Sequence, residues 1–151
     1  MKILFLDFDG VINSEEFMYS PLTKWKNEDY SSMIDPEKVL LLNEIVTRTG
    51  CKIVISSSWR LIHNIEDLNL FLIGKGFVGE VIGMTCKQFL IDKQKNAWSH
   101  RGHEIQKWIN NLKEPIESFS ILDDDSDMAH FDRFLVKTSW KKGLERKHVE
   151  M

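Results

Sequence analysis

Several features that would assign a protein to a particular class are scarce in this chain of 151 residues. Its two cysteines, Cys51 and Cys86, lack the spacing of a paired motif, so we expect buried reduced thiols rather than a disulfide or a metal site. No apolar stretch approaches the roughly 20 residues that are needed to cross a bilayer. The formal net charge of -3 does not support a strongly basic surface that coats nucleic acid.

The chain also contains no internal repeat, low-complexity segment or linker that would separate domains. We therefore expect a single domain over residues 1–151, which is long enough to bury a substantial core. Acidic residues directly follow a short first apolar run, which does not fit a signal peptide. These features predict a cytoplasmic protein without a membrane partner.

Short apolar runs that predict β-strands alternate with patterns that predict helices. The strands are expected at residues 3–6, 52–55, 78–85, 119–122 and 134–136. One helix should begin after Asp35 and end at Gly50, a second should begin at Asn64, and a third should begin near Arg101. This alternation is typical of an α/β fold, here a Rossmann-like parallel sheet of about five strands flanked by helices.

Polar clusters directly follow three of the predicted strands. Asp7 and Asp9 lie at the end of the first strand and share one side of it, and Gly10 then permits a sharp turn. Serines occupy positions 56–58 after the second strand, and acidic residues dominate positions 123–127 after the fourth. Because reactive groups in parallel sheets gather where the carboxyl ends of strands meet, we expect these clusters to form one site.

Carboxylates that converge without nearby cysteine or histidine ligands suit a hard cation that prefers oxygen, and Mg²⁺ is the natural choice. One aspartate of such a site can attack phosphorus, and the second can protonate the leaving oxygen and then activate water. A serine hydroxyl and a cation such as Arg101 would bind the phosphoryl oxygens. The alternative interpretation of each cluster is an ordinary polar turn at a strand end.

The order of these motifs resembles that of the haloacid dehalogenase (HAD) superfamily. The sequence Asp-Phe-Asp-Gly-Val at residues 7–11 is similar to its first motif, and Ser56 after the second strand is similar to its second. Arg101 fits the third motif, for which Lys87, Lys93 and Lys95 are alternatives. The acidic fourth motif corresponds to Asp123, Asp124 and Asp127.

The resemblance implies a role for each matched residue. Asp7 would be the nucleophile and Asp9 the general acid and base, while Ser56 and Arg101 would bind the transferring phosphoryl group. Mg²⁺ would be held by Asp7, by the carbonyl group of Asp9 and by a fourth-motif aspartate. Asp123 and Asp124 are the best metal candidates of that motif and Asp127 is the next, whereas Asp125 is expected to face solvent or to cap a turn.

A narrower resemblance links the chain to small HAD phosphatases of phages and bacteria, some of which are modules of RNA-repair enzymes. It rests on Ser-Ser-Ser-Trp-Arg at residues 56–60 and on Arg-Gly-His-Glu-Ile at residues 101–105. It implies that Arg60 contacts a substrate phosphate, with Gly10 and the backbone N–H of Ser57 as further substrate contacts.

Residues 13–35 lie where HAD proteins often insert a cap over the active site. The segment is too short for a folded cap domain, so we expect a flap or minimal cap and no full cap domain. Its Lys24 and Trp25 could meet the phosphates and stack on the bases of a nucleic-acid end, although a solvated loop is an equal alternative.

These features predict an Mg²⁺-dependent phosphomonoester hydrolase that acts through an aspartyl-phosphate on a nucleotide or a polynucleotide end, in the manner of a 3′-phosphatase. Phosphates of small metabolites are an alternative substrate class. A receiver domain of a signalling protein is less favoured, because its phosphate acceptor lies on a later strand than its acidic pair. A phosphate-binding domain without catalysis is another alternative, and no oligomeric state is indicated.

Overall fold

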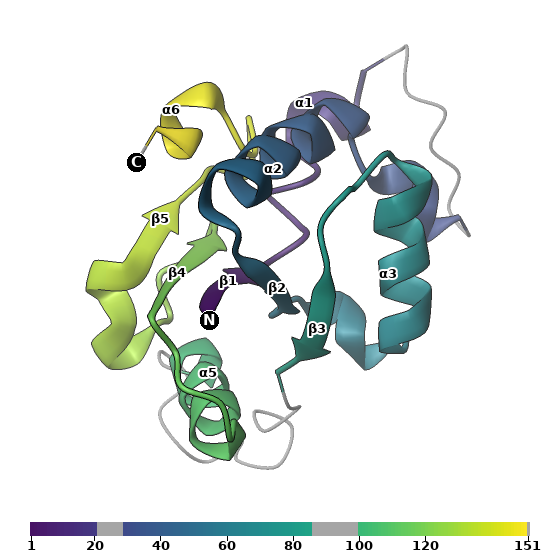
Figure 1. Cartoon of the computed structure of the whole chain (residues 1–151). Helices are drawn as coiled ribbons and strands as arrows, with labels where there is room; N and C mark the ends of the chain where they lie inside the picture. Colours follow the sequence, from purple (N-terminus) through teal and green to yellow (C-terminus); the bar gives the residue numbers. More distant parts are fainter. Residues whose placement is uncertain (21–28, 86–99, 151) are drawn as a thin grey trace.

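The structure, a computed structural model, describes residues 1–20, 29–85 and 100–150. Its centre is a five-stranded sheet in the order β3-β2-β1-β4-β5, in which every neighbouring pair is parallel (Figure 1). The strands are β1 (Lys2–Leu6), β2 (Lys52–Ile55), β3 (Val81–Met84), β4 (Ser118–Asp123) and β5 (Leu135–Lys137). The predicted α/β fold with a parallel sheet is therefore confirmed.

Helices connect the strands and cover both faces of the sheet. The α-helices are α1 (Glu15–Met18), α2 (Pro36–Thr49), α3 (Ile65–Gly74), α5 (His100–Asn111) and α6 (Arg146–Val149). Short 3₁₀ turns are η1 (Tyr30–Met33), η2 (Ser58–Leu61) and η4 (Ala129–Phe134). Side chains from α2 and α3 pack on one face of the sheet, while those from α5 and η4 pack on the other.

The central position of β1 follows from its continuous apolar sequence. Phe5 and Leu6 are fully buried, and they point to opposite faces because side chains alternate along a strand. Phe5 packs edge-on against Trp108 of α5, with the ring centres 5.7 Å apart. Strands β2 and β4 pair with the two edges of β1, so β1 lies in the middle of the sheet.

The ends of α2 lie where their capping residues predict. The side chain of Asp35 accepts a hydrogen bond from the backbone N–H of Glu37 at 2.9 Å, and Pro36 occupies the first turn. Gly50 closes the helix in the left-handed conformation with φ 71°. Asn64 likewise caps α3 by accepting from the N–H of Asp67.

Other predicted boundaries differ by a few residues. Strand β3 begins at Val81 rather than at Val78, because Gly79 precedes it and Val78 is 69% exposed. Helix α5 begins at His100, one residue before the expected start at Arg101. Cys51 is a buried free thiol, as expected, whereas Cys86 lies outside the described residues. Within those residues, no helix combines the length and the apolar character that a membrane span requires.

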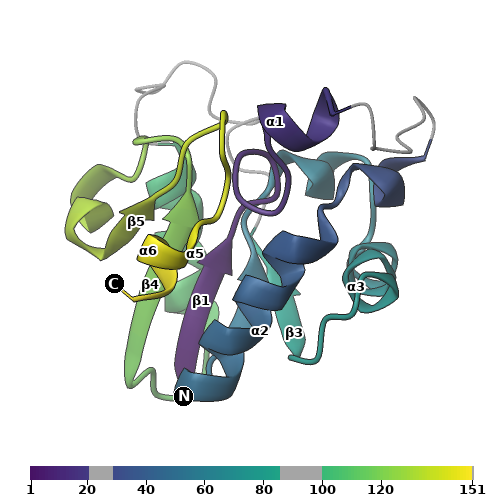
Figure 2. The ribbon, with the colours of Figure 1, turned by 90° about the horizontal axis from the view of Figure 1, so that it is seen from above.

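The described parts of the predicted flap, residues 13–20 and 29–35, form α1 and η1. Figure 2 shows α1 beside the loop that leaves β1, at the carboxyl end of the strands. Tyr30 of η1 packs edge-on against Trp59, with the ring centres 5.3 Å apart. Lys24 and Trp25 lie outside the described residues, so their contact with a substrate stays a prediction.

Candidate active site

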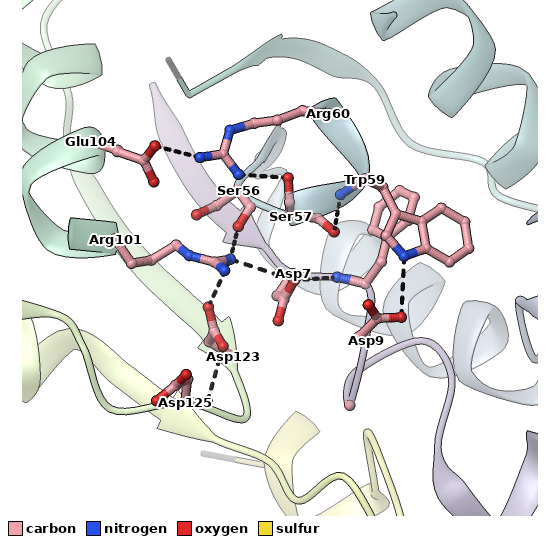
Figure 3. Close-up of polar contacts among 12 residues, drawn as sticks. Asp7, Asp9, Ser56, Ser57, Trp59, Arg60, Arg101, Glu104, Asp123 and Asp125 are labelled. Carbon is pink, nitrogen blue, oxygen red and sulfur yellow. Dashed lines mark hydrogen bonds and ion pairs between the residues drawn. The ribbon is translucent and has the colours of Figure 1, made fainter. Parts of the chain in front are cut away.

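The sheet brings three of the predicted polar clusters to one edge. The backbone N–H of Asp7 donates to the carbonyl of Leu122 at 3.0 Å, and that of Ser56 donates to the carbonyl of Leu6 at 2.8 Å. These bonds continue the ladders of β1 with β4 and with β2 beyond the strand ends. As a result Asp7, Ser56 and Asp123 emerge side by side, as Figure 3 shows.

Asp7 is a buried carboxyl group at the centre of this edge. Its Oδ1 accepts a hydrogen bond from the N–H of Phe8 at 2.8 Å. Burial raises the pKa of Asp7 well above its ordinary value, the neighbouring charge of Asp123 raises it further, and Arg101 acts in the opposite direction. A carboxyl group in such surroundings needs a cation to be stable in its charged form.

Three carboxylates lie close enough to share such a cation. Asp7, Asp123 and Asp124 each offer an oxygen, and these oxygens all lie within 4.8 Å of one another. Ligand oxygens bound to one Mg²⁺ at about 2.1 Å are about 3–4 Å apart, so little movement would be needed. Burial is also the largest cause that raises the pKa of Asp123 to about 6. The donor set and its uncompensated charge therefore fit a hard divalent cation.

Gly10 leaves room for the carboxylate of Asp124 beside the loop that follows β1. Its φ is 79°, in the region that favours glycine, and a Cβ added there would lie 2.2 Å from Oδ2 of Asp124. The carbonyl of Gly10 accepts a hydrogen bond from the hydroxyl of Thr138, just after β5. A side chain at position 10 would thus push Asp124 away from Asp7.

Arg101 supplies the positive charge of the site from the first turn of α5. Its Nη1 lies 3.4 Å from Oδ1 of Asp7 and 3.2 Å from Oδ2 of Asp123. The same nitrogen donates to the backbone carbonyl of Ser56. Burial lowers the pKa of Arg101, but Asp7 and Asp123 outweigh it, so its pKa is raised and its charge is retained. The alternatives Lys87, Lys93 and Lys95 lie outside the described residues.

The serines after β2 have different surroundings. The hydroxyl of Ser56 is buried and has no hydrogen-bond partner in the described structure, so a phosphoryl oxygen would satisfy it. The hydroxyl of Ser57 accepts from the N–H of Trp59 at 3.2 Å and caps η2. Ser57 is therefore a capping residue, while its backbone contact with a substrate stays a prediction.

Arg60 has a buried partner that the sequence analysis did not anticipate. Its guanidinium forms an ion pair with Glu104 of α5 and donates to the carbonyl of Ser57 at 2.6 Å. The side chains of Arg60 and Glu104 are only 1% and 2% exposed. These contacts favour a structural role for Arg60. They do not support the substrate contact that the resemblance implied, and that contact stays a prediction.

Asp9 is held by two residues that sequence reasoning did not single out. Its Oδ1 accepts hydrogen bonds from Nε1 of Trp59 at 3.1 Å and from Nδ2 of Asn13 at 3.0 Å. Asn13 is four residues away, so its position in the loop was a usable signal. Trp59 is 50 residues away from Asp9, and only the fold brings the two together.

The remaining acidic residues of the fourth motif lie beside the cluster. Asp127 is not among the three carboxylates that lie within reach of one ion, although its buried Oδ1 has no hydrogen-bond partner in the described structure. The carbonyl of Asp127 accepts from the N–H of Gly102 at 3.0 Å, which ties this loop to α5. Asp125 is exposed and its side chain accepts from the N–H of Ser126, as expected for a turn.

A comparison with sequence models of protein families matches residues 3–149 to the HAD domain in Swiss Army Knife RNA repair proteins. Comparison with curated proteins and with solved structures gave no match. The family match covers nearly the whole chain, and it confirms the resemblance that the four ordered motifs indicated. The chain therefore belongs to the HAD domain family of Swiss Army Knife RNA repair proteins, which supports a phosphatase-type function.

Proposed function

We propose that this protein is a Mg²⁺-dependent phosphomonoester hydrolase in which Asp7 forms an aspartyl-phosphate. The observation that carries the proposal is the convergence on Asp7 of two further carboxylates and a guanidinium. Each neighbour matches a need of phosphoryl transfer, since the guanidinium can bind the phosphoryl group and the two carboxylates can help to hold a cation that compensates its charge.

In the first step, a carboxylate oxygen of Asp7 attacks phosphorus, and a new P–O bond forms as the bond to the leaving oxygen breaks. The electron pair of that bond stays on the leaving oxygen, which takes a proton from Asp9. Arg101 and the hydroxyl of Ser56 lie beside Asp7, where they can donate to the phosphoryl oxygens. The products of this step are a free alcohol and the acyl phosphate on Asp7.

In the second step, water attacks the phosphorus of the acyl phosphate. Asp9, now a carboxylate, accepts a proton from that water, and the electron pair of the breaking bond returns to Asp7. Inorganic phosphate leaves, and both aspartates are back in their starting states. The same two carboxyl groups thus serve both halves of the reaction.

The residues that would hold Mg²⁺ are Asp7, Asp123 and Asp124. When bound, the ion would neutralise negative charge on the carboxylates and on the phosphoryl oxygens of the substrate. The carbonyl of Asp9 and the side chain of Asp127 remain further ligand candidates on the strength of the family resemblance. Because all of these donors are oxygens, Mg²⁺ suits the site better than a soft metal does.

For the substrate, we propose the phosphorylated end of a nucleotide or polynucleotide, with a 3′-phosphate as the first choice. The support comes from the family, whose description names RNA repair proteins. The described parts of residues 13–35 form only short helical turns beside the site, which agrees with a bulky substrate. Phosphates of small metabolites are the second candidate class.

The test is phosphate release from a 3′-phosphorylated oligonucleotide, nucleoside monophosphates and small sugar phosphates, each with Mg²⁺ and with EDTA. Asp7→Asn should reduce turnover by about 10³-fold or more, because the nucleophile is lost. Asp125→Asn is the matched control, since this exposed aspartate belongs to the same acidic run but its side chain accepts a hydrogen bond from the adjacent Ser126 N–H and is not part of the carboxylate cluster found among the described residues. Unchanged turnover in Asp7→Asn, or stable phosphorylation without release of phosphate, would refute the proposal.

A further inference from the structure

The carboxyl group of Asp9 is held asymmetrically. Both of its hydrogen bonds in the described structure, from Trp59 and from Asn13, reach the same oxygen, Oδ1. Figure 3 shows the indole of Trp59 above this oxygen, while Oδ2 is drawn on the side of Asp7. The two oxygens of the proposed acid and base therefore have different surroundings.

In both hydrogen bonds to Asp9, the chemistry of the groups shows which one donates and which one accepts. The indole Nε1–H of Trp59 can only donate, so Oδ1 must accept. The Oδ1 of Asn13 accepts from the backbone N–H of Gly10 at 3.0 Å, and that N–H can also only donate. The amide of Asn13 is thereby oriented so that its NH₂ group faces Asp9.

We propose that Trp59 and Asn13 are positioning residues that keep Oδ1 of Asp9 as an acceptor, so that the proton for the leaving group is carried on Oδ2. The inference rests on the proposed role of Asp9 as general acid. A proton on Oδ1 would face two N–H groups and would displace both of them. The only low-energy place for the proton is then the oxygen on the side of the nucleophile, Asp7.

The surroundings of Trp59 suit such a role. Its side chain is 4% exposed and lies between Phe8, at 5.0 Å between ring centres, and Tyr30 of η1. Trp59 also belongs to η2, which begins two residues after Ser56. One short segment therefore supplies both a candidate phosphate ligand and the group that orients the acid, so the two keep a constant separation.

The test compares Trp59→Phe with wild type on two phosphomonoesters that differ in their leaving group. An oligonucleotide 3′-phosphate releases an alkoxide that needs a proton, whereas 2,4-dinitrophenyl phosphate releases a stable anion that does not. We compare kcat/KM, because it reports the steps up to transfer of phosphate to Asp7. General acids contribute about 10²–10⁴-fold to rates. Misplacing the proton should therefore lower kcat/KM by about tenfold or more for the alkyl ester, and by less than about threefold for the aryl ester.

Two further variants show whether the effect is specific to the position of the proton on Asp9. Asp9→Asn should show the same discrimination between the esters more strongly, because it removes the acid itself. Trp108→Phe removes an indole that packs on Phe5 on the other face of the sheet, and it should leave both values near those of wild type. If Trp59→Phe does not fold, replacing Trp59 with its benzothiophene isostere deletes the N–H donor and retains the shape.

The possible outcomes separate this inference from the proposed function. An equal loss on both esters would overturn the positioning role, because a merely structural defect does not distinguish leaving groups. Unchanged kcat/KM on both esters would overturn it as well. If the wild-type protein hydrolyses neither ester with Mg²⁺, the proposed function fails first and the inference fails with it.

Discussion

Arg60 of η2 and Glu104 of α5 form an ion pair that is almost completely buried. Glu104 lies one helical turn after Arg101, whose guanidinium contacts Asp7 and the carbonyl of Ser56. The pair thus connects α5 to η2, which begins two residues after Ser56, and it lies near the contact between Arg101 and Ser56. We conclude that it maintains the spacing between α5 and the segment after β2, which carry Arg101 and Ser56.

Breaking this pair from one side should destabilise the protein strongly. Glu104→Gln removes the negative charge from the buried pair, so we expect the free energy of unfolding to fall by about 3–5 kcal/mol in urea denaturation. The double variant Arg60→Met with Glu104→Leu removes both charges and should recover much of that loss. Arg146→Gln, which breaks the exposed pair with Glu44, should have a much smaller effect. A Glu104→Gln protein as stable as wild type would contradict this interpretation.

Magnesium should stabilise the folded protein through its carboxylate cluster. Because the three oxygens are already close together in the folded chain, we expect Mg²⁺ to bind the folded chain better than the unfolded chain. At a concentration of 100 times its Kd, the ion should add about 2.7 kcal/mol to the free energy of unfolding. Thermal unfolding with Mg²⁺ and with EDTA measures the shift in Tm. Asp124→Asn should remove most of that shift and Asp125→Asn should not, whereas equal shifts in both variants would argue against this ligand set.

The metal-free protein should lose stability as the pH rises from about 4 to 6. The pKa of Asp123 is raised from 3.8 to about 6 in the folded state, so the native chain binds more protons than the unfolded chain in this range. The stabilising contribution is complete below pH 3.8 and is lost as the pH passes 6, and it amounts to about 3 kcal/mol. Urea denaturation in EDTA across this range should therefore show a smaller fall for Asp123→Asn than for wild type. Parallel pH profiles of the two proteins would contradict the prediction.

Gly10→Ala should damage both stability and metal binding. The substitution places a Cβ against the carboxylate of Asp124 and also strains a backbone with positive φ, which by itself costs about 1–2 kcal/mol. Gly50→Ala is the matched control, because Gly50 has φ 71° but no atom within 4 Å of the added Cβ. We expect Gly10→Ala to be the less stable of the two in urea denaturation and to have the weaker Mg²⁺-dependent shift in Tm. Equal behaviour of the two variants would show that the contact with Asp124 is unimportant.

Much of the fold could be predicted because its signals are local. Asp35 and Gly50 mark the ends of α2 through interactions within a few residues, and continuous apolar runs mark the buried strands. The end of each strand could therefore be placed, and with it the acidic and serine clusters. The predicted start of β3 was less accurate, because Gly79 interrupts the apolar pattern just before the strand.

Local sequence specifies which chemical groups follow which strand, since strand ends and helix caps depend on neighbouring residues. Which of those groups come into contact depends on how the strands and helices pack together. The strand order places Asp7 between Ser56 and Asp123, the turn at Gly10 admits Asp124, and packing brings Trp59 to Asp9 and Glu104 to Arg60. These contacts join residues that are distant in the chain, and their geometry depends on the packing of whole elements, which no short sequence pattern specifies.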